Sequence, residues 1–193
     1  KLINKIENHN IDYEIIIIND GSVDNTKKEI ENILINKRIN LINNEKNEGK
    51  SFSIINALPS CKYNNILLID CDLPYFDYLD QVILNIKKNF DLVCINRRSN
   101  KSVMINQNLT NYQKTRYMLG NLIGKLINLF LKIDLEGTDT QAGLKAFKKY
   151  HDFEKLVFNS KKYFFDLELI YYFRKNQKKI LSIPVKYKIA KES

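Results

Sequence analysis

The sequence predicts a single α/β domain whose mostly parallel sheet is covered by helices on both faces. The chain has 193 residues, 44% of them hydrophobic, which is enough for one sizeable core and short for two. Short apolar runs, such as Ile15 to Ile18 and Ile66 to Ile69, alternate with segments of helical periodicity. Such alternation of strands and helices is typical of parallel α/β folds. Residues 1–193 are therefore expected to form one domain.

Each element follows from a local pattern. Strands are expected where β-branched and apolar runs meet turn residues, at 13–19, 39–42, 65–70, 91–95, 144–147 and 180–187. Helices are expected where apolar residues recur at helical spacing, from 26 onward and at 49–58, 79–90, 118–133 and 166–174. Thr26 and Glu29 form a capping-box pattern that would open the first of these helices. Pro184 indicates that the last strand lies at an edge or contains a bulge.

The segment from Met118 to Ile133 has a wide apolar face that allows two interpretations. Its apolar residues are Leu119, Leu122, Ile123, Leu126, Ile127, Phe130 and Leu131. One interpretation is a helix packed in the core. The other is a helix that lies in a membrane interface, with Arg116, Lys125 and Lys132 at its margins. The segment is too short and too polar to span a bilayer.

Charge and cysteine content narrow the possible partners. The 31 basic and 22 acidic residues give a net charge of +9, which favours an anionic partner such as nucleic acid, an acidic membrane surface or a phosphorylated substrate. Because the basic residues are dispersed and no reading motif is found, nucleic acid is not expected. Cys61, Cys71 and Cys94 form no CxxC pair, which favours reduced thiols in a cytosolic setting over disulfides or zinc. Without a signal peptide or spanning segment, the chain is expected to be soluble or peripheral.

The most informative stretch is the apolar run Ile66 to Ile69 with the Asp70-Cys71-Asp72 that follows it. The run predicts a strand buried on both faces, as in parallel sheets covered by helices. Ligands gather at the carboxyl ends of such strands. If strand geometry persists past residue 69, Asp70 and Asp72 point to the same side and can share one hard cation with its phosphate ligands. The stretch therefore predicts a site for a metal and a diphosphate.

Two loops of the first half carry groups suited to the same site. In Asp20-Gly21-Ser22 the acid could accept a hydrogen bond from a base or ribose, and the alternative is an ordinary turn in which Asp24 caps the next helix. The stretch Asn47 to Lys50 precedes a helix, so its N–H groups and its lysine could face phosphate. Neither a P-loop spacing nor GxGxxG is present, so neither an NTPase nor a dinucleotide enzyme is supported.

Two segments of the second half also carry polar groups. The stretch Asp139 to Lys145 places an acid, an amide at Gln141, a flexible glycine and a base before a strand, and such a loop can line a site. Asp166 and Glu168 follow three aromatic residues, where they could turn toward a polar partner or cap the next helix. For Asp166 the local pattern favours the cap.

In this order the segments resemble the family-two glycosyltransferases of the GT-A fold, and within them the dolichyl- or polyprenyl-phosphate glucosyltransferase branch. The resemblance covers nearly the whole chain, and the ordered set carries it. The matching segments are Ile17 to Thr26 (DDGSxDxT), Asn47 to Lys50 (NxGKG), Asp70-Cys71-Asp72 (DxD), Asp139 to Lys145 (DTQCGFK), Phe165 to Glu168 (FDxE) and Ile183 to Val185 (VPV or VNW). The fold that this resemblance implies is a Rossmann-like GT-A sheet.

The resemblance implies a metal-dependent transfer of a hexose, glucose from UDP-glucose, to a polyprenyl or dolichyl phosphate. The residues expected to bind the nucleotide sugar are Asp20, Gly21, Ser22, Lys50 and Asp70. Asp70 and Asp72 would hold Mg2+ or Mn2+, and Asp72 and Asp139 are the expected catalytic residues, with Asp139 orienting sugar or acceptor. Arg97, Arg98, Arg116 and Lys145 would hold the acceptor phosphate, and Gln141, Asp166 and Glu168 would support the site. The expected location is the cytoplasmic face of a membrane: the ER in a eukaryote, the plasma membrane in a bacterium.

The sequence also departs from the family pattern. The usual first strand with its PxYNE-like loop is missing, since residue 1 begins in an expected helix; Asn19 replaces the first acid of the DD pair, and Ser51 stands where the family prefers glycine. Asn96-Arg97 replaces the usual Gly-Ser-Arg at the end of the fifth strand, and Pro74 favours the glucosyl over the mannosyl branch. The alternatives are therefore a relative with a mannosyl donor or a surface-polysaccharide acceptor, and a non-catalytic truncated relative. The oligomeric state stays open.

Overall fold

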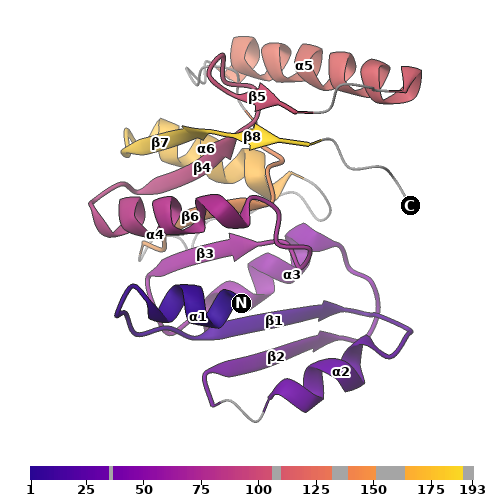
Figure 1. Cartoon of the computed structure of the whole chain (residues 1–193), viewed down its shortest axis with the longest axis vertical. Helices are drawn as coiled ribbons and strands as arrows, with labels where there is room; N and C mark the ends of the chain where they lie inside the picture. The colour runs from indigo at the N-terminus through magenta and orange to yellow at the C-terminus, as the bar shows by residue number, and fades with distance from the viewer. Residues whose placement is uncertain (35–36, 106–109, 132–138, 151–163, 189–193) are drawn as a thin grey trace. The chain divides into compact units, whose positions relative to one another are not determined.

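The structure, a computed structural model, describes residues 1–34, 37–105, 110–131, 139–150 and 164–188 (Figure 1). It confirms a mixed α/β architecture. The chain divides into two compact units: the first comprises Lys1–Ile66 and Lys149–Glu168, the second Leu67–Lys148 and Leu169–Ser193. The expectation of one domain over 1–193 stays a prediction.

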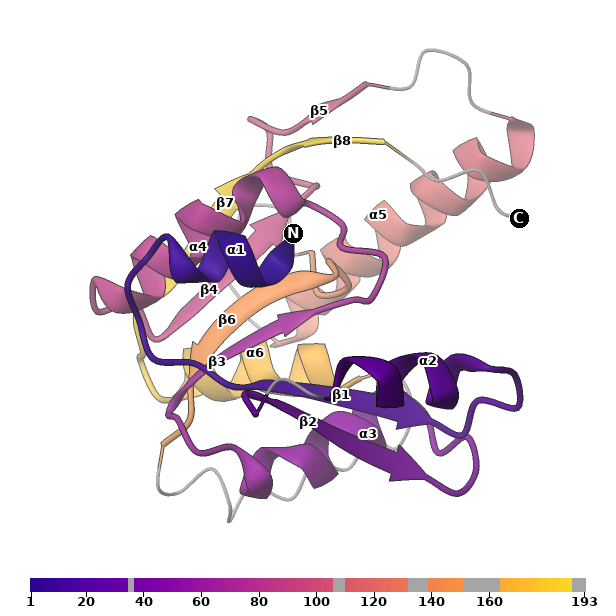
Figure 2. The ribbon, with the colours of Figure 1, turned by 60° about the horizontal axis from the view of Figure 1, so that its bottom comes forward.

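The first unit is built around two parallel strands. Its elements are α1 (Leu2–Glu7), β1 (Ile15–Asp20), α2 (Thr26–Ile33), β2 (Ile39–Asn44), α3 (Lys50–Ala57) and the 3₁₀ turn η1 (Leu58–Ser60). β1 and β2 run side by side in register from Ile15 opposite Ile39 to Asp20 opposite Asn44 (Figures 1 and 2). Their carboxyl ends therefore bring two polar residues, Asp20 and Asn44, to the same edge.

The second unit contains a four-stranded sheet among the residues that the structure describes. Its elements are β3 (Asn65–Ile69), η2 (Phe76–Tyr78), α4 (Leu79–Lys87), β4 (Leu92–Asn96), β5 (Val103–Met104), α5 (Asn111–Leu131), β6 (Leu144–Lys148), α6 (Phe165–Lys175), β7 (Ile180–Pro184) and β8 (Lys186–Tyr187), with β3 and α6 beginning in the first unit. The strand order is β3-β6-β4-β7, and β5 pairs separately with β8. β4 is buried along its whole length.

Helices cover both faces of this sheet, as predicted. α4 lies on one face and α6 on the other in both views (Figures 1 and 2). Leu79 and Val82 of α4 have no exposed surface. Phe173 of α6 meets Phe147 of β6 edge to face, with ring centroids 6.4 Å apart. The two helices therefore bury β6 and β4 between them.

The prediction of one mostly parallel sheet is confirmed only in part. β1 pairs with β2, β4 with β7, and β5 with β8 in parallel, but β6 runs antiparallel to β4. The described strands also fall into three separate sheets instead of one Rossmann-like sheet. Strand direction depends on tertiary connection, so the apolar pattern of 144–147 located the strand without fixing its orientation.

The expectation that Ile66 to Ile69 are buried on both faces is wrong, because all four are half-buried. The reason is position: β3 stands at the end of the strand order, with β6 as its neighbour. Strand geometry also stops at Ile69, since a turn follows in which the Leu73 N–H donates to the Asp70 carbonyl at 2.9 Å and Leu73 has a φ of 50°. The premise that an extended strand aligns Asp70 with Asp72 is therefore not met.

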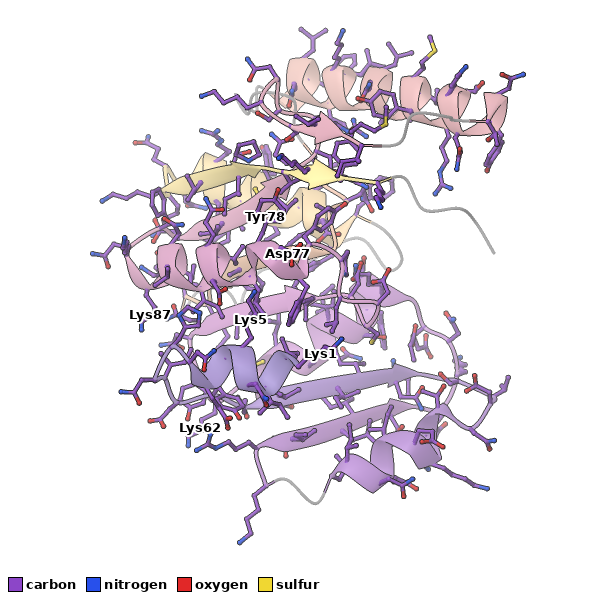
Figure 3. All side chains as sticks on the ribbon, viewed as in Figure 1. Lys1, Lys5, Lys62, Asp77, Tyr78 and Lys87 are labelled. Carbon is purple, nitrogen blue, oxygen red and sulfur yellow. The ribbon has the colours of Figure 1, made fainter. Side chains whose placement is uncertain are left out.

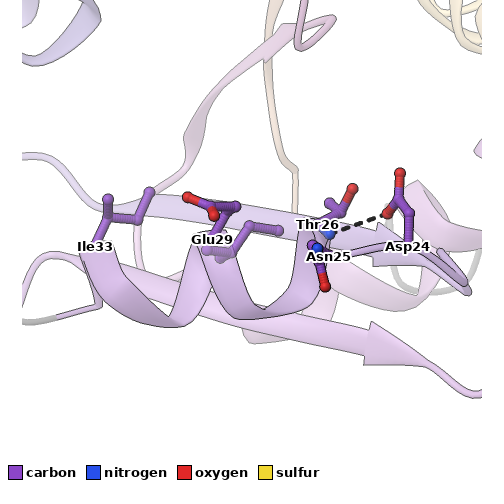
Figure 4. Close-up of a pocket in the computed structure, with 6 residues that line it drawn as sticks. Asp24, Asn25, Thr26, Glu29 and Ile33 are labelled. Atoms are coloured by element: carbon purple, nitrogen blue, oxygen red, sulfur yellow. Dashed lines mark hydrogen bonds between the residues drawn. The ribbon is translucent and has the colours of Figure 1, made fainter.

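The start of α2 differs from the capping box expected of Thr26 and Glu29. Thr26 is the first helical residue, and its N–H donates to the Asp24 carboxylate at 3.0 Å (Figure 4). Asp24 thus satisfies one of the unpaired N–H groups at the start of the helix, as the alternative interpretation of this loop expected. Asp24 and Thr26 are among the residues that line a hollow beside α2 (Figure 4). The Asp24 carboxylate in this hollow already accepts the Thr26 N–H.

The boundary signal at Pro184 is confirmed, whereas α5 (Asn111–Leu131) begins earlier than the helix predicted over 118–133. Pro184 is the last residue of β7, which stands at the end of the strand order, as an edge proline should. α5 ends at Leu131 in the described part of the chain, and Lys132 and Ile133 lie outside it.

The core interpretation of α5 is wrong. Its apolar residues are largely exposed, with Met118 at 70%, Leu129 at 71% and Phe130 at 77%. The others in this group are Leu119, Leu122, Ile123 and Leu126. No helix in the described ranges has the length and apolar character needed to cross a membrane.

Candidate functional site

In the first unit, Asp20 holds the loop between β2 and α3. Its Oδ1 accepts from the Asn44 side chain at 2.8 Å and from the Glu48 N–H at 3.0 Å, and its Oδ2 accepts from the Gly49 N–H at 2.9 Å. Partial burial by itself raises the pKa of Asp20, but these hydrogen bonds outweigh it and leave the pKa below its ordinary value. Asp20 is therefore an ionised acceptor at the N-terminus of α3.

The backbone around Asp20 is closely packed. Gly21 has a φ of 71°, and a Cβ there would collide with the backbone of Lys46 and Asn47. Asn19 is buried; its side-chain N–H donates to Asn43 at 3.0 Å, and its Oδ1 accepts from the Ser22 N–H at 3.2 Å. The loops after β1 and β2 thus form one hydrogen-bonded assembly.

This arrangement changes what was expected of the loop 47–50. The N–H groups of Glu48 and Gly49, predicted to face phosphate, donate to Asp20 instead. Lys50 and Ser22 are exposed at the edge of the assembly, where a ligand can reach them. Their nucleotide-binding roles, and that of Asp20, stay predictions.

In the second unit, Asp70 packs against the loop before β6. The Asp70 N–H donates to the Gly143 carbonyl at 3.0 Å, and a Cβ at Gly143 would collide with the Asp70 carboxylate and with Pro74. Gly143 is needed for this close approach and not for a left-handed backbone. Asp70 is half-buried and Asp72 is exposed.

Asp139 and Arg97 form an ion pair with several hydrogen bonds in this unit. The Asp139 carboxylate accepts from Arg97 Nε at 2.5 Å, from Arg97 Nη2 at 2.8 Å and from the Arg97 N–H at 3.1 Å. The Gln141 N–H donates to it at 3.3 Å. This two-pronged geometry is the strong form of an arginine–carboxylate contact.

Electrostatics links this pair to the loop after β3. Burial by itself raises the pKa of Asp139, but the hydrogen bonds and the charge of Arg97 outweigh it and hold the pKa below the ordinary value. Tyr75, with a φ of 61°, has a pKa raised by burial, and its hydroxyl also interacts with Arg97 and with the charges of Asp139 and Asp72. Tyr75 is therefore within electrostatic reach of Arg97, Asp139 and Asp72.

The four predicted phosphate ligands have different surroundings. Arg97 keeps 31% of its side chain exposed beside Asp139. Arg98 is half-buried and donates to the Gly120 carbonyl of α5, and Arg116 is exposed on α5. Lys145 is only 3% exposed and donates to the Thr140 carbonyl at 3.3 Å, so its ammonium is turned into the protein and its role as a phosphate ligand is not supported.

The acids of the predicted FDxE motif lie in the first turn of α6. Asp166 is the second residue of the helix and is buried, so it is not the N-cap that its local pattern favoured. The first N–H of α6, from Phe165, donates to the hydroxyl of Ser51 at 3.3 Å. Asp166 and Glu168 are well placed for a favourable interaction with the helix dipole.

Sequence reasoning missed three participants. No local sequence pattern indicated a role for Tyr75 in the site, since an aromatic residue after Pro74 is usually interpreted as one that packs against neighbouring side chains. Asn44 could have been found, because parallel pairing of the first two strands places the residue at the end of one beside that of the other. Gly143 was predicted as a flexible residue, and its contact with Asp70 is a tertiary fact.

Asp70 and Asp72 are the predicted metal-binding residues. In the described ranges no cluster of three or more His, Cys, Asp or Glu side chains could hold a metal ion. Asp70 and Asp72 supply oxygen donors, the ligand type that Mg2+ and Mn2+ prefer. Two carboxylates suit a cation whose other ligands come from a bound diphosphate and water.

The basic side chains labelled in Figure 3 belong to three parts of the chain. Lys1 precedes α1 and Lys5 lies on it, Lys62 precedes β3, and Lys87 ends α4. The expectation that nucleic acid is not a partner stays a prediction.

Comparison with known proteins gives a consistent result. The model of the family "Glycosyl transferase family 2" matches residues 1–138. A protein of Trichomonas vaginalis named "Dolichyl-phosphate beta-glucosyltransferase ALG5C" is 26% identical over 194 residues, which cover 94% of this chain and 54% of that protein. A dolichyl-phosphate beta-glucosyltransferase of Dictyostelium discoideum is 26% identical over 186 residues, 90% of this chain and 53% of that protein.

A third relative is matched over a shorter stretch. The Bacillus subtilis protein named "Putative glycosyltransferase CsbB" is 27% identical over 133 residues, which are 68% of this chain and 37% of that protein. The chain thus spans about half the length, or less, of these relatives.

Proposed function

Because the chain belongs to glycosyl transferase family 2, we propose that it transfers glucose from UDP-glucose to a polyprenyl or dolichyl phosphate. The family makes it a glycosyltransferase that uses a nucleotide-sugar donor. The choice of acceptor rests on the ordered motif set and on two relatives named dolichyl-phosphate beta-glucosyltransferases that align with at least 90% of the chain. The observation that carries the proposal is the two-pronged pair of Arg97 and Asp139, in which Asp139 is buried and Arg97 keeps 31% of its side chain exposed, so that its guanidinium is open to an anionic ligand.

Asp70 and Asp72 would hold the divalent cation, and their fit rests on the chemistry of their oxygen donors, since the turn after Ile69 does not align them as an extended strand would. Asp70 is held in place by its contact with Gly143, while Asp72 is open to solvent. When bound, Mg2+ or Mn2+ would supply Lewis-acid stabilisation of the charge that develops on the leaving diphosphate.

The acceptor side of the reaction makes modest demands on the protein. A phosphate monoester is largely ionised near neutral pH, since its second pKa is about 6, so it needs less from a general base than an alcohol would. What it needs is a cationic partner that orients it. Arg97, Arg98 and Arg116 are the arginines that we assign to this task.

Membrane association is part of the proposal. The exposed apolar residues of α5, with Arg116 and Lys125 beside them, have the character of a helix that lies in a lipid interface. A lipid-linked acceptor requires such proximity. We place the enzyme at the cytoplasmic face of a membrane, the ER in a eukaryote or the plasma membrane in a bacterium.

A thermal-shift experiment with UDP and Mn2+ tests the donor half of the proposal. At a ligand concentration of 100 times the Kd, binding stabilises a protein by about 2.7 kcal/mol. We expect a metal-dependent rise in melting temperature that Asp72→Ala abolishes. Asp77→Ala is the matched control, because Asp77 is an exposed carboxylate in the next turn of the chain (Figure 3).

The result that would overturn the donor assignment is the absence of a shift with any nucleoside diphosphate and metal. The sugar and the acceptor are then identified with labelled UDP-glucose and GDP-mannose on membranes that contain the protein. Label from UDP-glucose in the lipid extract supports the proposal. Label from GDP-mannose, or label only in polysaccharide, would replace it with one of the alternative assignments.

A further inference from the structure

Asp139 has a carboxylate that a substrate cannot reach directly. Its side chain has no exposed surface, whereas 31% of the Arg97 side chain is exposed. Both carboxylate oxygens accept hydrogen bonds from Arg97 or from the Gln141 N–H. Asp139 therefore cannot contact a ligand directly in this structure, and Arg97 is its exposed partner.

We propose that Asp139 is a positioning residue, and that it presents the outer edge of the Arg97 guanidinium to a phosphoryl group of the substrate. This inference rests on the proposed function, because the family supplies the phosphorylated ligands. It makes specific the role expected of Asp139, which was that of a catalytic residue that orients sugar or acceptor. The residue that touches the ligand is Arg97.

The geometry supports this division of roles. Asp139 takes Arg97 Nε and one side of Nη2, so the remaining N–H groups lie on the part of the guanidinium that faces away from the carboxylate. A guanidinium has five N–H donors in a fixed plane, so holding one edge fixes the direction of the other. Tyr75, in the loop that follows Asp70 and Asp72, also interacts with this guanidinium. Arg97 therefore has its inner edge held by Asp139 and keeps part of its side chain open to solvent.

The charge state of the pair agrees with this role. A carboxylate paired with arginine stays ionised. Because the ion pair already holds the arginine side chain in one orientation, that side chain loses little conformational entropy when it forms further hydrogen bonds to a ligand. A lysine at position 97 would keep the charge and lose the two-pronged contact. The Arg97→Lys substitution therefore separates the effect of the positive charge from the effect of its fixed orientation.

The phosphoryl group could belong to the acceptor monoester or to the diphosphate of the donor, and two probes distinguish them. The first is farnesyl phosphate, a water-soluble isoprenyl monoester, and the second is UDP with Mn2+. The experiment measures the Kd of each probe by calorimetry for the wild type, Asp139→Asn, Arg97→Gln and the double variant. Arg97→Lys is added to test orientation against charge.

We expect each single substitution, and Arg97→Lys, to weaken one probe about tenfold or more, the value of one hydrogen bond to a charged group. Asp139→Asn should have no further effect once Arg97 is glutamine, because a residue that acts through another has nothing to act on when the other is gone. The probe that weakens identifies the phosphoryl group. Thermal unfolding confirms that each variant is folded.

Independent effects would overturn the inference. If the double variant weakens binding by the product of the two single effects, Asp139 contacts the ligand by itself. Arg97→Gln leaves a buried carboxylate unpaired and for that reason could fail to fold. In that case Arg97→Lys takes its place in the comparison of single and double variants. Wild-type affinity in Arg97→Lys would contradict the proposed orienting role of Asp139. Failure of the wild type to bind either probe would instead contradict the proposed function.

Discussion

Replacing Asp20 with asparagine is expected to lower the melting temperature by about 4–12 °C. Asparagine keeps one oxygen for the Asn44 side chain and the Glu48 N–H, but it turns an N–H donor toward the N–H of Gly49. A hydrogen bond to a charged group contributes about 1.5–3 kcal/mol and a neutral one about 0.5–1.5 kcal/mol. One bond is lost and two are weakened.

The magnitude follows from these values. Because the Asp20 carboxylate is only partly buried, solvent moderates the effect, and we expect a loss of about 2–3 kcal/mol in the free energy of unfolding. A chain of this size loses about 2–4 °C for each kcal/mol. Thermal unfolding followed by circular dichroism at pH 7 measures the change.

The pH dependence has a definite sign. The pKa of Asp20 is lower in the folded protein than its ordinary value of about 3.9, so the stabilisation is fully present above that value and is lost as the pH falls through the lowered pKa. The difference in stability between the wild type and Asp20→Asn should therefore be constant above about pH 5 and shrink below about pH 4.

Asp24→Asn is the matched control. Asp24 lies in the same loop and also accepts a backbone N–H, but it is exposed. We expect a clearly smaller change in melting temperature for this variant. Equal melting temperatures for the two variants, or a difference for Asp20→Asn that persists unchanged at pH 3, would refute the assignment of Asp20 as the residue that holds the loop.

Two further substitutions test other contacts. Gly143→Ala should destabilise the protein by about 1–3 kcal/mol, the usual cost of overpacking, and should also weaken Mn2+-dependent UDP binding because the new Cβ displaces Asp70; unchanged binding would separate Asp70 from the metal. Ser51→Ala should lower the free energy of unfolding, measured by chemical denaturation, by about 1 kcal/mol, because the first N–H of α6 loses its acceptor. Ser53→Val is not a valid control, since the Ser53 hydroxyl also accepts a hydrogen bond. Wild-type stability of Ser51→Ala would contradict a stabilising role for this hydrogen bond.

Local patterns predicted most of the elements, because each depends on residues that are close in sequence. The β-branched run of β1 and the apolar spacing of α4 are examples. The same patterns could not distinguish β3 from β4: both read as apolar runs, yet β4 is buried along its length and β3 is half-buried. The difference lies in position within the sheet, which is set by the rest of the fold.

The candidate site was predicted residue by residue but not as a set of contacts. Asp139 and Arg97 were both singled out, with the roles of catalytic residue and phosphate ligand. Their pairing joins residues 42 positions apart and could not be read from either segment. Burial of Lys145 was equally inaccessible, since a lysine at the start of a strand gives no sign of which way its side chain turns.

The departures from the family pattern in the first unit each have a partner in the structure. An aspartate at position 19 could not donate a hydrogen bond when ionised, whereas the Asn19 amide donates to Asn43 and accepts from Ser22. A glycine at position 51 would leave the Phe165 N–H without the hydroxyl that Ser51 provides. Both replacements therefore add hydrogen bonds within the unit and leave Asp20 ionised. They give no physical reason to expect an inactive relative.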